Sequence, residues 1–94
     1  MKLEDIKVGQ IVKDKFDNEY IVKEIIEDNS MPVKLKCTKF LKPINVQKIG
    51  DIYFKEAGIS FWIYKSGKDA RVCGCDVDCI TVESLKLKGE SKLN

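Results

Sequence analysis

The sequence contains no histidine, and Arg71 is its single arginine among 94 residues. Without histidine the chain lacks the commonest general base and the commonest ligand of catalytic zinc. Because the remaining basic residues are all lysines, bidentate recognition of phosphate or guanine has one candidate donor. The sequence also shows no glycine-rich phosphate loop, no Ser-His-Asp set and no paired-carboxylate site. We therefore predict that this protein is not an enzyme.

Long hydrophobic runs are missing as well. The apolar runs reach only about four or five residues, far fewer than the roughly 20 needed to cross a bilayer, and the opening MKLEDIKVGQ has no apolar signal region. The overall composition, 44% hydrophobic and 34% charged, is that of a folded protein. These features predict one cytoplasmic domain over residues 1–94, without a membrane partner.

The net charge of +2 conceals an uneven distribution along the chain. Residues 31–72 carry nine basic residues against three acids, whereas residues 1–30 carry five against eight. Such a basic island is typical of a surface that meets an acidic protein or a nucleic acid. The alternative is that these lysines only form the solvent-exposed face of a sheet and bind no partner.

Short runs rich in β-branched residues, bounded by Asp, Asn, Gly and Pro, predict strands throughout the chain. Residues 10–15 and 19–27 are expected to form a hairpin, and residues 41–50 a connection. The stretch 51–75 is expected to alternate strand and turn, with turns at 57–58 and 66–69. Residues 79–89 are expected to start as a strand, with one helical turn within residues 82–88 as the alternative, and residues 90–94 form a frayed tail.

Residues 33–40 show the clearest alternation in the sequence. Val33, Leu35 and Cys37 fall on one face, and Lys34 and Lys36 on the other. Since no segment has a helical apolar period, the fold class predicted is all-β. We expect a small barrel or sandwich of five to seven mostly antiparallel strands.

A weak internal repeat relates residues 3–22 to residues 44–63 at an offset of 41. Gly9 then corresponds to Gly50, and Ile11 corresponds to Ile52. A duplicated hairpin is one explanation, and chance similarity between two β-hairpins is the other.

The segment KVGQIVKDKFDNEYIVKEI, residues 7–25, resembles the first hairpin of small Src-homology-type β-barrels, including the Tudor and KOW families. In these families a G-x-x-V step leads into a strand and a tight turn. The resemblance implies a barrel of about five strands that binds peptides, proteins or nucleic acids and has no catalytic activity.

Residues 71–79, RVCGCDVDC, hold three of the four cysteines. On a strand, alternation places one set of side chains inward: Cys73, Cys75, Val77 and Cys79. Asp76 and Asp78 would then face water. The main alternative is a structural zinc site in which Cys37 supplies the fourth thiolate, although these spacings differ from the usual pairs. A disulfide and a reactive thiol are further alternatives.

The leading functional hypothesis is a small protein-binding module. In SFWIY, alternation places Phe61 and Ile63 on one face and leaves Trp62 and Tyr64 on the other. Trp62 and Tyr64 would serve as exposed anchors, with Lys34 and Lys36 facing an acidic partner. A second layer covering both aromatic residues is the alternative. A small cytoplasmic binder of this kind would suit a phage or mobile-element inhibitor of a host protein, in an anti-CRISPR-like role.

Two other functions compete with this hypothesis. A nucleic-acid-binding β-barrel would use the basic island through one set of side chains: Lys34, Lys36, Lys39, Lys42 and Arg71. A zinc-stabilised module would use the cysteines at 37, 73, 75 and 79. No cofactor other than zinc is expected. An exposed edge strand would allow two copies to pair, so both a monomer and a homodimer fit the sequence.

Overall fold

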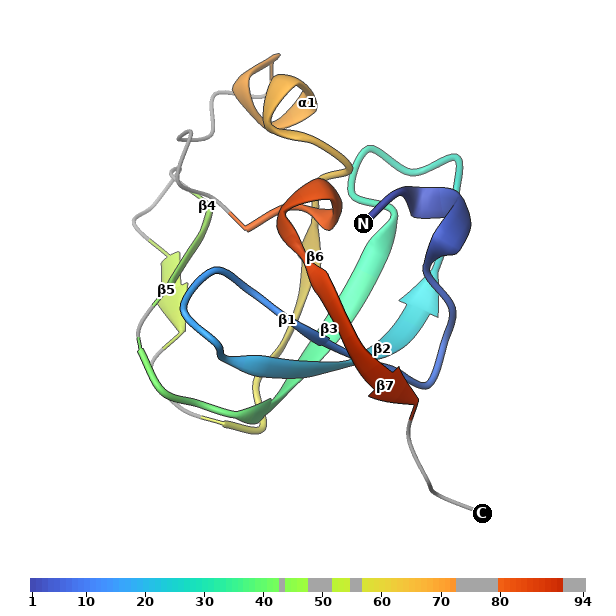
Figure 1. Cartoon of the computed structure of the whole chain (residues 1–94). Helices are drawn as coiled ribbons and strands as arrows, with labels where there is room; N and C mark the ends of the chain where they lie inside the picture. The colour runs from blue at the N-terminus through green and yellow to red at the C-terminus, as the bar shows by residue number, and fades with distance from the viewer. Residues whose placement is uncertain (43, 48–51, 55–56, 73–79, 91–94) are drawn as a thin grey trace.

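The computed structural model describes residues 1–42, 44–47, 52–54, 57–72 and 80–90 (Figure 1). In chain order the elements are η1 (Leu3–Asp5), β1 (Gln10–Lys13), β2 (Glu19–Ile25), β3 (Val33–Lys39), β4 (Ile44–Gln47), β5 (Ile52–Phe54), β6 (Ser60–Ile63), α1 (Gly67–Val72), η2 (Val82–Ser84) and β7 (Lys86–Glu90). The prediction of an all-β fold built from short strands is confirmed.

The strands form two sheets. The larger sheet has five strands in the order β6-β3-β2-β1-β7, and β4 and β5 form a separate pair. All of these named strand pairs are antiparallel. Because β7 joins β1 at one edge, the end of the described chain completes the sheet that the first hairpin begins (Figure 1).

The β1–β2 hairpin forms as the sequence predicts. Gly9 enters β1 with a φ of 94°, a conformation that favours glycine, and its N–H donates to the Val22 carbonyl over 2.9 Å. At the other end of the hairpin, Asp17 adopts a φ of 66°, in the left-handed region that Asp tolerates better than most residues. The two strands then pair in register, with Val12 opposite Tyr20.

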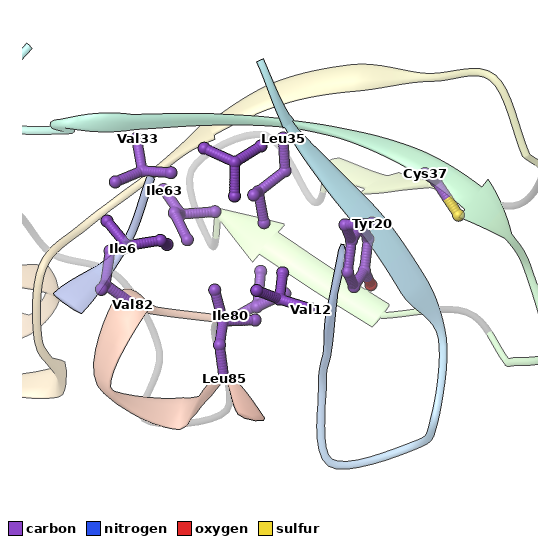
Figure 2. Packing of buried hydrophobic residues seen from close by; sticks show 11 residues of the cluster. Ile6, Val12, Tyr20, Val33, Leu35, Cys37, Ile63, Ile80, Val82 and Leu85 are labelled. Carbon is purple, nitrogen blue, oxygen red and sulfur yellow. The ribbon is translucent and has the colours of Figure 1, made fainter. Parts of the chain in front are cut away.

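The alternation of β3 determines where the hydrophobic core lies. Val33, Leu35 and Cys37 are at most 1% exposed, as expected. Figure 2 shows their side chains on one side of the cluster, with those of Ile80 and Leu85 approaching from the other. The core therefore lies between the inner face of the five-stranded sheet and the chain segment that leads into β7.

β6 follows a short turn at residues 57–58 and pairs with β3. Gly58 has a φ of 92°, and its N–H donates to the Cys37 carbonyl over 2.7 Å. The prediction that Phe61 and Ile63 share one face is confirmed, and this face is the inner one. Ile63 is fully buried, and the Phe61 ring meets the Tyr20 ring edge-on at 5.6 Å between centroids.

The structure corrects the prediction of a strand at the start of the cysteine-rich stretch. Arg71 and Val72 belong to the six-residue helix α1. Ser66 caps this helix, because its Oγ accepts the Asp69 N–H over 3.2 Å and its hydroxyl donates to Asp69 Oδ2 over 3.0 Å. The polar residues at 66–69, which predicted a turn, therefore form the start of helix α1. In the described segments, no helix combines the length and the apolar composition needed to cross a membrane.

One further expectation needs correction. Residues 41–50 are not wholly a connection, since Ile44–Gln47 forms β4 and pairs with β5. In the segment that leads into β7, the alternative of one helical turn is confirmed. Thr81 makes an isolated bridge, Val82–Ser84 forms the helical turn η2, and the strand starts only at Lys86. A local bond explains the turn, because the Thr81 N–H donates to the Ser84 hydroxyl over 3.0 Å.

The structure bears on the apparent internal repeat and on only one residue of the predicted frayed tail. Within residues 3–22, β1 pairs with β2, whereas within residues 44–63, β5 pairs with β4 and β6 pairs with β3. The two stretches therefore differ in strand pairing, and a duplication stays a prediction. Glu90 ends β7, and residues 91–94 of the expected tail lie outside the described residues.

Candidate binding surface

The face of the five-stranded sheet opposite to the core is the first candidate surface, and we call it the outer face. Antiparallel partners share a face, so the strand register defines its residues. Three cross-strand rows result: Trp62, Lys34 and Glu24; then Ser60, Lys36, Ile21 and Ile11; then Lys39, Glu19, Lys13 and Lys86. The prediction that Lys34 and Lys36 share a solvent-facing side of β3 is confirmed.

The first row contains two residues of the predicted protein-binding set, Trp62 and Lys34. Trp62 lies opposite Lys34 across the β3–β6 pair. The Lys34 Nζ lies 6.0 Å from the centroid of the Trp62 ring, within the range of a cation–π contact. Both residues are half-buried. The ammonium group therefore neighbours an aromatic ring that is partly open to solvent.

The middle row is less polar. Ile11 and Ile21 are cross-strand partners and both remain partly exposed, while Lys36 lies beside Ile21 on the neighbouring strand. Aliphatic side chains thus continue the surface from the Trp62 end towards the middle of the sheet. A mixture of partly exposed apolar groups and lysines is suited to contact with another macromolecule.

The third row, which we call the lysine row, surrounds one carboxylate. Lys88 Nζ lies 2.7 Å from Glu19 Oε1, and Lys39 Nζ lies 4.0 Å from Oε2. Lys13 is the cross-strand partner of Glu19, and Lys86 is that of Lys13. The hydrogen bond from Lys88, reinforced by the charges of Lys88, Lys39 and Lys13, lowers the pKa of Glu19.

The expectation that Tyr64 is exposed beside Trp62 is wrong. Tyr64 retains 8% of its accessible surface. β6 ends at Ile63, and Tyr64 then forms a parallel bridge with Thr81, while its carbonyl accepts the Val82 N–H over 2.9 Å. A second layer of chain therefore covers Tyr64, as the alternative interpretation required, and it leaves Trp62 partly exposed.

The proposed zinc ligands can be placed only in part. Cys37 is 1% exposed in the core, and burial raises the pKa of its thiol. Cys73, Cys75 and Cys79 lie outside the described residues, so their inward orientation and the zinc site both stay predictions. Among the described residues, no three His, Cys, Asp or Glu side chains gather as a metal site would require.

The alternative nucleic-acid set is not a single surface in the structure. Lys34 and Lys36 belong to the outer face, and Lys39 joins the lysine row. Lys42 lies instead at the β1–β2 turn, where its Nζ is 5.9 Å from the Phe16 ring centroid. Arg71 is in α1, and its side chain is outside the described residues.

A buried polar network shapes that turn, and the sequence analysis did not identify it. Asp14 and Asn18 are 2% and 0% exposed. Asp14 Oδ1 accepts the Phe16 N–H over 2.7 Å, while its Oδ2 accepts the Asn18 side-chain amide over 2.9 Å. Asn18 Oδ1 in turn accepts the N–H of Leu41 over 2.6 Å and that of Lys42 over 2.9 Å. The network joins the first turn to the chain that leaves β3.

Phe16 is the second feature that sequence reasoning missed. It is 38% exposed, and Leu41 beside the network is 50% exposed. The Lys15 Nζ lies 5.3 Å from the Phe16 ring centroid, on a turn that also brings Lys42 near the ring. The signal in the sequence was a phenylalanine at the centre of the polar turn DKFDN.

No family model matches the chain, and neither a curated protein nor a solved structure shows significant similarity to it. The resemblance of residues 7–25 to Src-homology-type barrels therefore stays a prediction.

Proposed function

We propose that this protein is a non-enzymatic binding module that docks an acidic protein partner on its outer face. The observation that carries the proposal is the pairing of Lys34 with Trp62, whose ring centroid lies 6.0 Å from the ammonium group. Tryptophan is enriched among residues that dominate binding energy, and a neighbouring lysine adds charge complementarity.

The rest of the outer face supports the same function. Ile11 and Ile21 extend the apolar area beyond Trp62, and Lys36 adds a second positive charge. These residues project from strands rather than from loops, so little ordering is needed when a partner binds. Tyr64 no longer belongs to this site, because it is covered. In this proposal the domain acts by occupying its partner's surface, as a phage or mobile-element inhibitor of a host protein would.

The experiment is comparative affinity capture from a lysate of the source organism. The bait proteins are the unaltered chain, Trp62→Ala, Lys34→Gln and a control that combines Val8→Ala with Lys2→Gln. Val8 and Lys2 are exposed and lie outside the strands of the sheet, since Val8 precedes β1 and Lys2 precedes η1. The control thus removes one apolar group and one charge away from the outer face.

We expect one acidic protein to be captured by the unaltered chain and the control. Trp62→Ala should weaken its binding by roughly 30-fold or more, as is typical of a residue that dominates an interface. Lys34→Gln should produce a smaller loss that depends on salt concentration. Capture of the same proteins in equal amounts by all four baits would contradict the proposal.

A further inference from the structure

A second surface lies at the end of the sheet where the β1–β2 turn is located, and we call it the basic end. It consists of the three lysines of the lysine row, Lys88, which is paired with Glu19 of that row, and the two lysines at the turn. The six lysines are Lys13, Lys15, Lys39, Lys42, Lys86 and Lys88. The row borders the turn directly, because β1 ends at Lys13 and the turn begins at Asp14.

This surface is assembled by the fold rather than by a local run of sequence. Its lysines come from β1, the first turn, β3, the segment after β3, and β7. Three carboxylates, those of Asp14, Asp17 and Glu19, lie at the same end, so six lysines leave a net charge of +3. Neighbouring strands are about 4.8 Å apart, so the row from Lys39 on β3 to Lys86 on β7 extends over roughly 14 Å.

Phe16 adds an aromatic group to this charged surface. Its ring is 38% exposed, and two lysine Nζ atoms lie within 5.3 and 5.9 Å of its centroid. The Asp14 carboxylate accepts the Phe16 N–H over 2.7 Å, and the following Asp17 has a positive φ. The buried network therefore fixes the backbone of the residue that presents the ring.

We propose that the basic end binds single-stranded nucleic acid, with a base against Phe16 and phosphates along the lysines. An exposed aromatic ring next to a positively charged track is the combination by which proteins bind single strands without reading their sequence. In a duplex the base faces are stacked on one another, so the ring favours a single strand. Lysines act as point charges and position the backbone, in keeping with binding that does not depend on sequence.

The site is separate from the outer-face site proposed above. Trp62 and Lys34 occupy the first cross-strand row, and the lysine row is the third. The two proposals can therefore fail independently. Trp62→Ala should change oligonucleotide affinity by less than about twofold, and Phe16→Ala should not affect protein capture on the outer face.

The test is fluorescence anisotropy with a labelled 15-nucleotide oligothymidylate and a labelled oligouridylate of the same length. With about three phosphate contacts, binding should weaken roughly 20-fold between 50 and 200 mM salt. Loss of stacking in Phe16→Ala should weaken binding by about 5- to 100-fold. Val8→Ala is the matched control, since Val8 is 62% exposed and precedes Gly9 at the opposite end of β1.

Charge variants test the lysines separately from the ring. Lys15→Gln combined with Lys42→Gln should reduce the slope of log affinity against log salt by about 1.4. Lys23→Gln combined with Lys65→Gln makes the same change in net charge at exposed positions outside the basic end, and should leave the slope almost unchanged. Circular dichroism of every variant verifies that the fold is retained.

Several outcomes would overturn the proposal. One is absence of binding at 50 mM salt. Another is binding that Phe16→Ala leaves unchanged. A third is equal competition by polyglutamate together with insensitivity to Phe16→Ala, which would identify a surface for acidic proteins. Equal slopes of log affinity against log salt for the two double lysine variants would show that the net charge of the molecule attracts the oligonucleotide, and not the lysines of the basic end.

Discussion

The Tyr20 hydroxyl donates a hydrogen bond to Asp14 Oδ2 over 2.5 Å, between two side chains that are almost fully buried. Burial disfavours the charged form of the phenol, and the Asp14 carboxylate disfavours it further. Both effects raise the pKa of Tyr20. The contact also connects the hydrophobic core to the polar network of the first turn, because the Tyr20 ring packs against Phe61 on the inner face of the sheet.

The first prediction concerns stability at alkaline pH. Tyr20 keeps its proton in the folded protein at a pH where it ionises in the unfolded chain, near pH 10. Its contribution to the free energy of unfolding is therefore complete below about pH 10 and is lost as the pH rises further. Urea unfolding curves measured at increasing pH should show this decline, and Tyr20→Phe should make it smaller. An unchanged alkaline decline in Tyr20→Phe would contradict the assignment.

The second prediction concerns the residue that joins the first turn to the segment after β3. Asn18→Ala removes the acceptor for two backbone N–H groups, at Leu41 and Lys42, and the donor to the Lys42 carbonyl over 2.8 Å. We expect a loss of about 2–4 kcal/mol in the free energy of unfolding, since three part-buried backbone groups and the buried Asp14 carboxylate lose a partner together. Thermal denaturation measures the loss. Asp17→Asn is the neighbouring control, because Asn also tolerates a positive φ, and it should change stability by less than about 0.5 kcal/mol.

The alternation of apolar and polar residues predicted which side chains are buried where only one face of a strand packs on the core. In β3, the inward set of Val33, Leu35 and Cys37 follows directly from the order of apolar and polar residues. The same reasoning failed at Tyr64, which is covered because Thr81 bridges to it from a distant part of the chain. A pattern within five residues carries no information about such a partner.

Short runs of polar residues did not determine the local structure on their own. Ser, Gly and Asp are favoured both in turns and at the start of a helix, so residues 66–69 fitted either structure until the Ser66–Asp69 hydrogen bonds were known. The basic end could not be predicted from the sequence either. Lys13 and Lys86 are far apart along the chain and become partners only through the pairing of β1 with β7.

The third prediction concerns acid sensitivity at the lysine row. The pKa of Glu19 is lowered in the folded protein, principally by the hydrogen bond from Lys88. The ionised carboxylate therefore adds stability above its unfolded pKa, about 4.3, and this contribution is lost as the pH falls through the folded value. Glu19→Gln should be less stable than the unaltered chain at neutral pH, and the difference should shrink in acid.

Glu24→Gln provides the matched control for this acid effect. Glu24 is exposed on the same strand, in the row that contains Lys34. Chemical denaturation at neutral pH and in acid, at low salt, compares the two variants. Equal acid dependence of the unaltered chain and Glu19→Gln would show that the lysine row does not stabilise the carboxylate.

The fourth prediction uses Trp62, the only tryptophan in the chain, as a reporter of the outer face. Its ring is partly exposed and lies near the Lys34 ammonium group, so an anionic quencher should be concentrated beside it. At about 0.1 M ionic strength, charges act over roughly 10 Å, a range that includes the 6.0 Å between Lys34 Nζ and the ring centroid. Lys34→Gln should therefore reduce quenching of Trp62 fluorescence by iodide and leave quenching by neutral acrylamide unchanged. Lys15→Gln removes the same charge from the β1–β2 turn, beyond the third row, and should affect neither quencher. If both lysine variants lower iodide quenching equally, the positive potential at Trp62 comes from the net charge of the molecule and not from its cross-strand partner.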